Sequence, residues 1–208
     1  LKQILIMKKI VTLVLLVAST VVMAQKVKIE KGDFKFLSGQ TEVNVEFDYS
    51  NLKLMKENLT ESQYVAERTA ELNEKAKGNG DSWAKKWEAS KQLAWQPKFT
   101  ELVNVVLSKK KKNITFQEDL TSAKYTLLVD VVWMYPGYNV VMAKKGAKVT
   151  TVLTFVETAN KSNVLAVISS ENAPGDVFGG SFSNEDRIRE GFAKTGKTLA
   201  GLILKDLK

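Results

Sequence analysis

Apolar and polar residues alternate strictly in the N-terminal part of the chain. The apolar positions of this pattern are Phe34, Phe36, Val43, Val45, Phe47 and Tyr49. A period of two is typical of a strand that has one face on a core and the other in water. Because the turn-forming pair Ser38-Gly39 separates the two runs, the pattern predicts a hairpin with one wet, acidic face.

Residues 60–109 carry the period of helices instead. Thr60 with Gln63 three residues later forms a capping box, which predicts a helix that begins there and ends at Gly78. A second helix is expected to begin at residues 81–82. Pro97 stops or kinks that helix and suits the first turn of a third one.

The C-terminal half returns to strands. After a short apolar stretch at Ile114–Phe116, longer ones follow at Tyr125–Met134, Val149–Val156 and Val164–Ser169, with hairpin-like links between them. Neither repeats nor a linker-like stretch interrupts the pattern. We therefore expect one α+β domain over residues 25–208, with a largely antiparallel sheet, helices packed on it and a closing C-terminal helix.

The segment GFAKTGKT, Gly191–Thr198, matches the phosphate-loop pattern G-x-x-x-x-G-K-[ST]. A phosphate loop follows a buried strand, but here Ser183 and Asp186 resemble a capping box that starts a helix. On that helix a stripe of about 100° holds mostly apolar residues. The stripe consists of Ile188, Phe192, Thr195, Leu199, Leu202 and Ile203. Lys197 lies opposite it, so the segment predicts a packed amphipathic helix and no nucleotide site.

The first residues have the organisation of a secretory leader. Lys8-Lys9 precede the apolar run Ile10–Met23, and Val22–Ala24 supplies small residues at a cleavage site before Gln25. We expect a signal peptide over residues 1–24, with the true start at Met7 and a periplasmic or secreted mature protein. The alternative is a buried N-terminal helix. Because no cysteine is present, an N-terminal lipid anchor is not expected, and neither is a stable membrane anchor after processing.

Composition narrows the chemistry. Without cysteine there are no disulfides, and without histidine the chain lacks the usual general base at neutral pH and the commonest zinc ligand. We therefore expect no metal and no cofactor. The net charge of +8 is concentrated partly at Lys109–Lys112, which suits a helix C-terminus or a polyanion site. No aromatic residues accompany this run, and an exported protein rarely meets nucleic acid, so a nucleic-acid partner is not expected.

The turn around Pro136 and Gly137 carries the aromatic residues Trp133, Tyr135 and Tyr138. Exposed aromatic side chains on a rigid turn suit contact with a partner protein or a glycan. Simple packing of the loop is the alternative.

Acidic residues provide a rival hypothesis. Asp130 interrupts an apolar strand, so it lies on the wet face or is buried with a partner, for which Lys148 is the candidate. A hydrolase that works without histidine would use carboxylates such as Asp130, Glu118 and Asp119. Against this alternative, we expect an exported, non-enzymatic protein that binds an envelope macromolecule or a glycan.

A glycine-rich segment precedes the closing helix, at Ala173–Gly175 and Phe178–Gly180. Such a segment before a helix N-terminus binds an anion in some proteins and is a plain tight connection in others.

Several short motifs in the last 85 or so residues resemble the C-terminal half of a group of exported proteins of the Bacteroidetes with no characterised activity. These motifs are Tyr135–Asn139, Thr154–Glu157, Asn163–Ala166, Ala173–Gly175, Phe178–Gly180, and Ile188, Ala193-Lys194 and Gly196-Lys197 in the closing helix. The resemblance implies an envelope or secreted location and transfers no catalytic residue. The layout is also loosely similar to small α/β modules of outer-membrane assembly lipoproteins, from which this chain departs by lacking the lipid-bearing cysteine.

Overall fold

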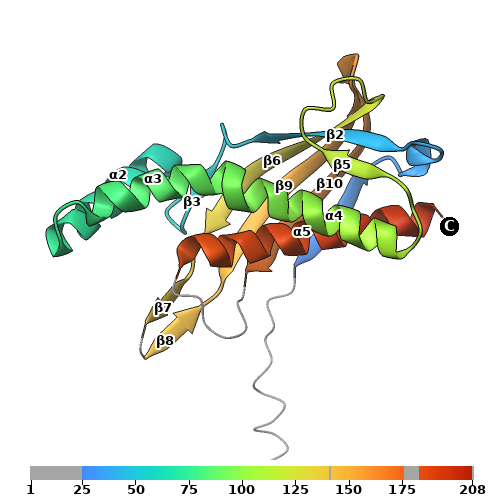
Figure 1. Cartoon of the computed structure of the whole chain (residues 1–208). Coiled ribbons are helices and arrows are strands. Elements are labelled where there is room, and N and C mark those ends of the chain that lie inside the picture. The colour runs from blue at the N-terminus through green and yellow to red at the C-terminus, as the bar shows by residue number, and fades with distance from the viewer. Residues whose placement is uncertain (1–24, 141, 176–182, 208) are drawn as a thin grey trace, which may run out of the picture.

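The computed structural model of the protein describes residues 25–140, 142–175 and 183–207. These residues form one mixed β-sheet whose one face is covered by helices (Figure 1). The sheet has the strand order β1-β10-β9-β6-β2-β5. The expected signal peptide at residues 1–24 lies outside the described residues.

The antiparallel part of the sheet is the larger. It consists of β1 (Lys26–Lys31), β10 (Asn160–Gly175), β9 (Ala147–Glu157) and β6 (Tyr125–Tyr135). The parallel pairings involve β2 (Glu42–Asp48), which lies between β5 (Thr115–Gln117) and β6, and β3 (Lys53–Leu54), which pairs with β6. The short strand β4 (Leu59–Thr60) is antiparallel to β3. A small separate hairpin consists of β7 (Tyr138–Val140) and β8 (Ala143–Lys145). The α+β class and the single domain are therefore confirmed.

The helices are η1 (Lys35–Leu37), α2 (Glu61–Lys75), α3 (Asn79–Ser90), the π-helical turn η2 (Lys91–Trp95), α4 (Gln96–Lys109) and α5 (Asn184–Asp206). Thr60 caps α2 with the expected reciprocal bonds: the Gln63 amide donates to the Thr60 hydroxyl over 3.2 Å, and the Thr60 amide donates to the Gln63 side chain over 2.9 Å. Pro97 lies in the first turn of α4, as expected.

The second helix begins earlier than residues 81–82. The side-chain oxygen of Asn73 accepts hydrogen bonds from the amides of Gly78 and Gly80, at 3.0 and 2.8 Å. Gly78 has the left-handed φ of 86°, and α3 starts directly after it at Asn79. The cap comes from the preceding helix, so no local capping residue marks this start.

The predicted hairpin between Phe34–Phe36 and Val43–Tyr49 is wrong. Residues 35–37 form η1, and β2 pairs in parallel with β6 instead. The side chains of Phe34 and Phe36 pack against the core, where both rings make edge contacts with the ring of Phe155. Alternation identifies which side of a segment is buried, but it does not identify the partner strand. The sheet is consequently mixed.

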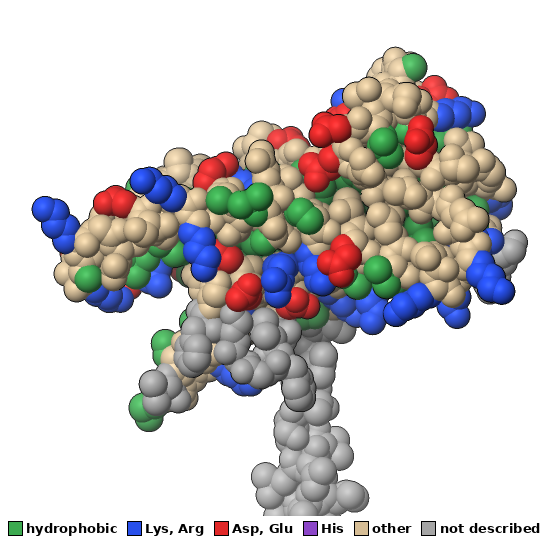
Figure 2. All heavy atoms as spheres, in the orientation of Figure 1, with side chains coloured by type: hydrophobic (Ala, Val, Ile, Leu, Met, Phe, Trp, Pro, Cys, Tyr) green, Lys and Arg blue, Asp and Glu red, His purple; other side chains and the backbone are tan. Residues whose placement is uncertain are grey.

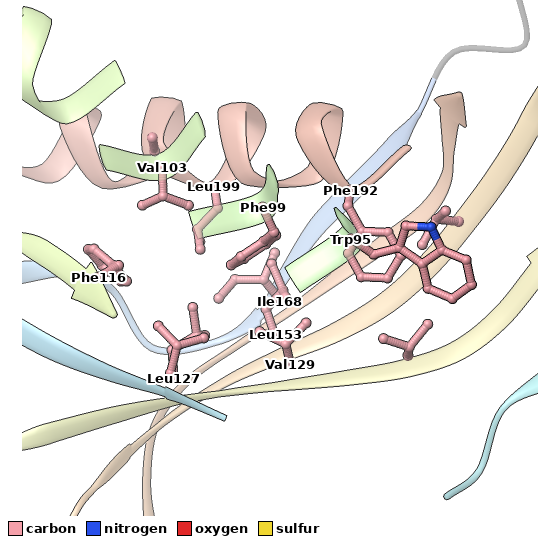
Figure 3. Close-up of a cluster of buried hydrophobic side chains, with 14 of the residues drawn as sticks. Trp95, Phe99, Val103, Phe116, Leu127, Val129, Leu153, Ile168, Phe192 and Leu199 are labelled. Atoms are coloured by element: carbon pink, nitrogen blue, oxygen red, sulfur yellow. The ribbon is translucent and has the colours of Figure 1, made fainter. Parts of the chain in front are cut away.

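Helices α4 and α5 lie side by side across one face of the sheet (Figure 1). Figure 3 shows the core between them and the strands. Its labelled, fully buried members are Trp95, Phe99, Val103, Phe116, Leu127, Val129, Leu153, Ile168, Phe192 and Leu199. The inward positions of β5, β6, β9 and β10 supply the strand side chains, as the period of two requires.

The segment GFAKTGKT lies inside α5, which begins at the N-cap Ser183, so the helix prediction is confirmed. A Cβ on Gly196 would lie 2.3 Å from the carbonyl oxygen of Phe99, and one on Gly191 would lie 2.6 Å from Val149. The two glycines of the motif thus allow α5 to approach α4 and β9 closely. Lys197 is exposed.

Candidate functional site

A cleft of about 660 Å³ lies where α2, the segment before α2, the β6–β7 turn and the start of α5 meet. Tyr135 and Tyr138 line it from the turn, Tyr64 and Glu67 from α2, and Arg187 from α5. We call it the Tyr135 cleft. Two of the three aromatic residues proposed from the sequence therefore line one cleft.

Trp133, the third of these residues, supports Tyr135 from outside the cleft. Its indole N–H donates a hydrogen bond to the carbonyl oxygen of Met55 over 2.8 Å. Its ring is stacked on that of Tyr135, with centroids 6.5 Å apart and an interplanar angle of 12°. The Lys145 ammonium lies 5.0 Å from the centroid of the Tyr135 ring. The Trp133 ring and the Lys145 ammonium thus hold the Tyr135 ring in place.

A β-bulge in β6 sets the direction of the Trp133 and Tyr135 side chains. The pairing of β6 with β9 shifts register between Val131 and Trp133. Val131 and Met134 are buried in the core, whereas Trp133 and Tyr135 are only half-buried. Bulges commonly redirect side chains next to functional sites. Because of this shift, Trp133 and Tyr135 both point away from the core that holds Val131 and Met134.

Two tyrosine hydroxyls of the cleft, those of Tyr135 and Tyr64, have a raised pKa. Burial raises the pKa of Tyr135, and the neighbouring Tyr138 raises it further. Burial raises the pKa of Tyr64 to about 12. Tyr138 is the most accessible of the three rings, with 42% of its surface exposed. The cleft therefore presents tyrosine rings as aromatic surface and their hydroxyls as hydrogen-bonding groups.

Arg187 anchors the turn to α5. Its side chain is 4% exposed, and its Nε donates to the carbonyl oxygen of Pro136 over 3.2 Å, while another of its nitrogens donates to Asn184. Burial lowers the pKa of Arg187, which remains a cation because a guanidinium titrates far above neutral pH. This residue was missed from the sequence. Arg187 lies four residues before Gly191, so the two residues are on the same side of the helix, and this side is buried. A cation at such a position was the signal in the sequence that could have identified Arg187.

Both signs of charge line the Tyr135 cleft. The acidic side chains are Glu57, Glu67 and Glu71, and the basic ones are Arg68 and Arg187. Arg68 and Lys75 both form ion pairs with Glu71 along α2. Within the described part of the chain, no group of three or more acidic side chains is placed to hold a metal ion. Such a lining suits a polar ligand that both donates and accepts hydrogen bonds.

Asp130 lies elsewhere, on the sheet face away from the helices. Its strand neighbours are Val152 and Asp48, whereas Lys148 pairs with Tyr135, so the suggested partnership with Lys148 is wrong. One carboxyl oxygen of Asp130 is buried without a hydrogen-bond partner among the residues described. Burial and the charge of Asp48 raise the pKa of Asp130.

The other proposed carboxylates do not join Asp130. Burial raises the pKa of Glu118, and Asp119 beside it adds to the shift. Neither residue, nor Asp130, lines the Tyr135 cleft. Of the glycine-rich segment, Ala173–Gly175 ends β10, and Phe178–Gly180 lies outside the described residues.

A second cleft, of about 530 Å³, lies at the ends of α4 and α5. Lys35, Lys111 and Lys112 line it together with Asp206. Lys112 donates a hydrogen bond to the carbonyl oxygen of Leu207, next to the end of α5. Cations are favoured at helix C-termini, so this placement supports the interpretation of the lysine run as a helix end.

Comparisons with known proteins give a distant likeness only. No protein-family model matches the chain, and no curated protein sequence matches it. The PelC dodecamer from Paraburkholderia phytofirmans is similar with a TM-score of 0.35 and 10% identity over 88% of this chain and 95% of that one. A variant of the same dodecamer with one leucine replaced by methionine gives a TM-score of 0.32 and 8% identity over 82% and 97%. Values this low carry no argument about function.

Within residues 25–140, 142–175 and 183–207, no helix has the length and apolar character needed to cross a membrane.

Proposed function

We propose that the protein is exported and binds a glycan in the Tyr135 cleft without catalysing a reaction. The single observation that carries the proposal is the rigid aromatic wall of the cleft, where Tyr135 is stacked on Trp133 and Trp133 is tied to Met55. A ring that is already fixed loses little entropy when a ligand packs on it.

The chemistry of the lining fits a sugar ring. An aromatic face carries negative charge density, which attracts the C–H groups on one side of a pyranose. The sugar hydroxyls lie around the ring edge, where carboxylates such as Glu67 accept hydrogen bonds and the tyrosine hydroxyls both donate and accept them. The volume of about 660 Å³ falls within the usual range of small-ligand sites, about 300–1,000 Å³. A short glycan segment is therefore the favoured ligand.

Export is supported by the sequence pattern of residues 8–24 and by the position of Gln25. The Gln25 side chain donates to the Ser170 hydroxyl over 2.9 Å and accepts from the Thr198 hydroxyl over 2.8 Å. The chain is therefore held to β10 and α5 from the first residue after the expected cleavage site.

Binding is favoured over hydrolysis by the positions of the carboxylates. Glycoside hydrolysis requires two carboxyl groups on either side of one scissile bond. The carboxylates that the sequence suggested for a hydrolase, Asp130, Glu118 and Asp119, do not meet in the Tyr135 cleft. Of the acidic residues that do line it, Glu71 is held in ion pairs with Arg68 and Lys75. A binding protein would leave an added oligosaccharide intact.

The proposal can be tested with an array of neutral, acidic and amino-sugar oligosaccharides, probed with the chain that begins at Gln25. We expect a defined subset to be retained and recovered without cleavage, as mass spectrometry would show. Retention of the same subset by Tyr135→Ala/Tyr138→Ala would contradict the role of the cleft. Release of shortened products would support the hydrolase instead.

A further inference from the structure

The β7–β8 hairpin extends away from the sheet and the helices (Figure 1). Its cross-strand pairs are Tyr138 with Lys145, Asn139 with Lys144, and Val140 with Ala143. Each strand is three residues long, so the hairpin is a narrow projection. It forms a two-stranded sheet of its own, separate from the main sheet.

The end of this hairpin is apolar and exposed. Met142 has 95% of its surface exposed and Val140 has 57%. Ala143 beside them is exposed as well. Figure 2 shows hydrophobic atoms at the end of the projection, below the body of the molecule. Val140 and Met142 lie outside the core, and because they are together at the end of a projection they form one small exposed apolar surface.

Lysines follow directly behind the apolar end. Lys144 and Lys145 are exposed on β8, and Lys148 lies on β9 opposite Tyr135. Lys56, in the segment before α2, is exposed as well. Burial lowers the pKa of Lys148, and the charges of Lys145 and Lys56 lower it further. Among the residues that the structure describes, no ion pair involves any of the four lysines. The two hairpin strands themselves contain no acidic residue, whereas Glu57, Glu67 and Glu71 line the adjacent cleft.

We propose that the β7–β8 hairpin docks on a membrane surface that contains anionic lipids, with Val140 and Met142 inserted among the headgroups and the lysines held over them. Apolar side chains that enter the interface by about 5–10 Å, backed by basic residues, are the usual elements of peripheral membrane binding. Each lysine near an anionic surface adds to the attraction. The site goes beyond glycan binding and does not depend on it.

A lipid surface fits the hairpin better than a partner protein does. A stable protein interface covers about 800 Å² on each side. A projection of two three-residue strands offers a convex end far smaller than this. A fluid interface closes around such an end without needing a matching surface. Because Tyr138 and Val140 also line the Tyr135 cleft, docking would hold that cleft close to the headgroups.

Vesicle binding by the chain that begins at Gln25 tests the proposal. The probes are vesicles of phosphatidylcholine alone and vesicles with phosphatidylglycerol added. We expect binding to the second kind, weakened about tenfold or more by Val140→Ser/Met142→Ser and by Lys144→Gln/Lys145→Gln. All four side chains are exposed, so the fold should survive, as circular dichroism would check.

Two matched controls separate docking from general stickiness. Leu93→Ser removes another exposed apolar side chain, 79% exposed on η2. Lys110→Gln/Lys111→Gln removes two lysines near the end of α4, which lies at the opposite side of the molecule from the hairpin (Figure 1). Both controls should bind within about twofold of the unmodified protein. An equal loss in the lysine control, or no vesicle binding at all, would overturn the proposal.

A second readout locates the contact. Because the sequence contains no cysteine, Met142→Cys can carry a polarity-sensitive fluorophore at a single position. We expect its emission to shift to shorter wavelength when the anionic vesicles are added, whereas the same fluorophore at Leu93→Cys should not respond. Equal responses at the two positions, or none at position 142, would contradict insertion of the hairpin.

Discussion

The rings of Trp133 and Tyr135 are stacked almost in parallel, with an interplanar angle of 12°. Residues i and i+2 of a strand lie on the same side, which brings the two rings together. The hydrogen bond from Trp133 to the Met55 carbonyl oxygen then fixes the indole ring of the pair. Tyr135 therefore occupies its position in the cleft before any ligand arrives.

Replacing the indole tests this support. We expect Trp133→Phe to lose the hydrogen bond to Met55 and about 1 kcal/mol of unfolding free energy. Urea denaturation measures the change, and the m-value should stay the same. Glycan affinity should fall with the looser ring, although Trp133 does not line the cleft. Unchanged stability and affinity would show that Tyr135 is held by other contacts.

A second prediction concerns the segment GFAKTGKT in helix α5. Leu199→Ala should cost about 2–5 kcal/mol because Leu199 is 1% exposed. Lys197→Ala should change stability by less than about 0.5 kcal/mol because its side chain is in water. ATP and GTP should leave the Tm unchanged. A nucleotide-dependent rise in Tm that Lys197→Ala abolishes would contradict the packed-helix interpretation.

Asp130 gives the fold a pH dependence. Its pKa is raised in the folded protein, mainly by burial, so the folded state binds a proton more tightly than the unfolded chain does. The resulting stability is fully present below the unfolded pKa, about 3.9, and is lost as pH rises through the raised folded pKa. Asp130→Asn should therefore be more stable than the unmodified protein at pH 7 and should lose this advantage below about pH 4. Urea denaturation across this range measures it. A variant that is less stable at pH 7 would contradict the prediction.

Processing provides a prediction about the compartment. The exported protein should begin at Gln25, because the leader pattern ends there and the Gln25 side chain is already bonded to Ser170 and Thr198. Intact-mass measurement of the exported fraction would show the N-terminus. A mass that includes Ile10–Met23 would contradict both the signal peptide and the proposed location.

Local patterns predicted the fold where the determining contacts are local. The capping box at Thr60, the proline at position 97 and the long strands of the C-terminal half follow from neighbouring residues. The partner of β2 could not be predicted, because alternation is the same whether a strand pairs with its neighbour or with the distant β6. The start of α3 depends on Asn73 in another helix, which no capping pattern records.

Only part of the candidate site could be predicted, because only some of its residues lie close together in the sequence. The aromatic turn was visible in the sequence, because Tyr135 and Tyr138 lie around Pro136. The opposite wall was not, since Tyr64 and Arg187 come from segments far away along the chain. The register shift before Trp133 is also a property of the pairing between β6 and β9, and periodicity alone does not show it.

Glycan binding by the Tyr135 cleft is tested most directly by calorimetric titration of one retained oligosaccharide into three proteins: the unmodified chain, Tyr135→Ala/Tyr138→Ala and Tyr135→Phe/Tyr138→Phe. Loss of both rings should weaken binding about tenfold or more, since each aromatic contact contributes about 0.5–1.5 kcal/mol. The phenylalanine variant keeps the ring faces and loses only the hydrogen bonds of the two hydroxyls, so its affinity should lie between those of the other two proteins. Equal affinity of the alanine variant and the unmodified protein, with both shown to be folded, would contradict the account.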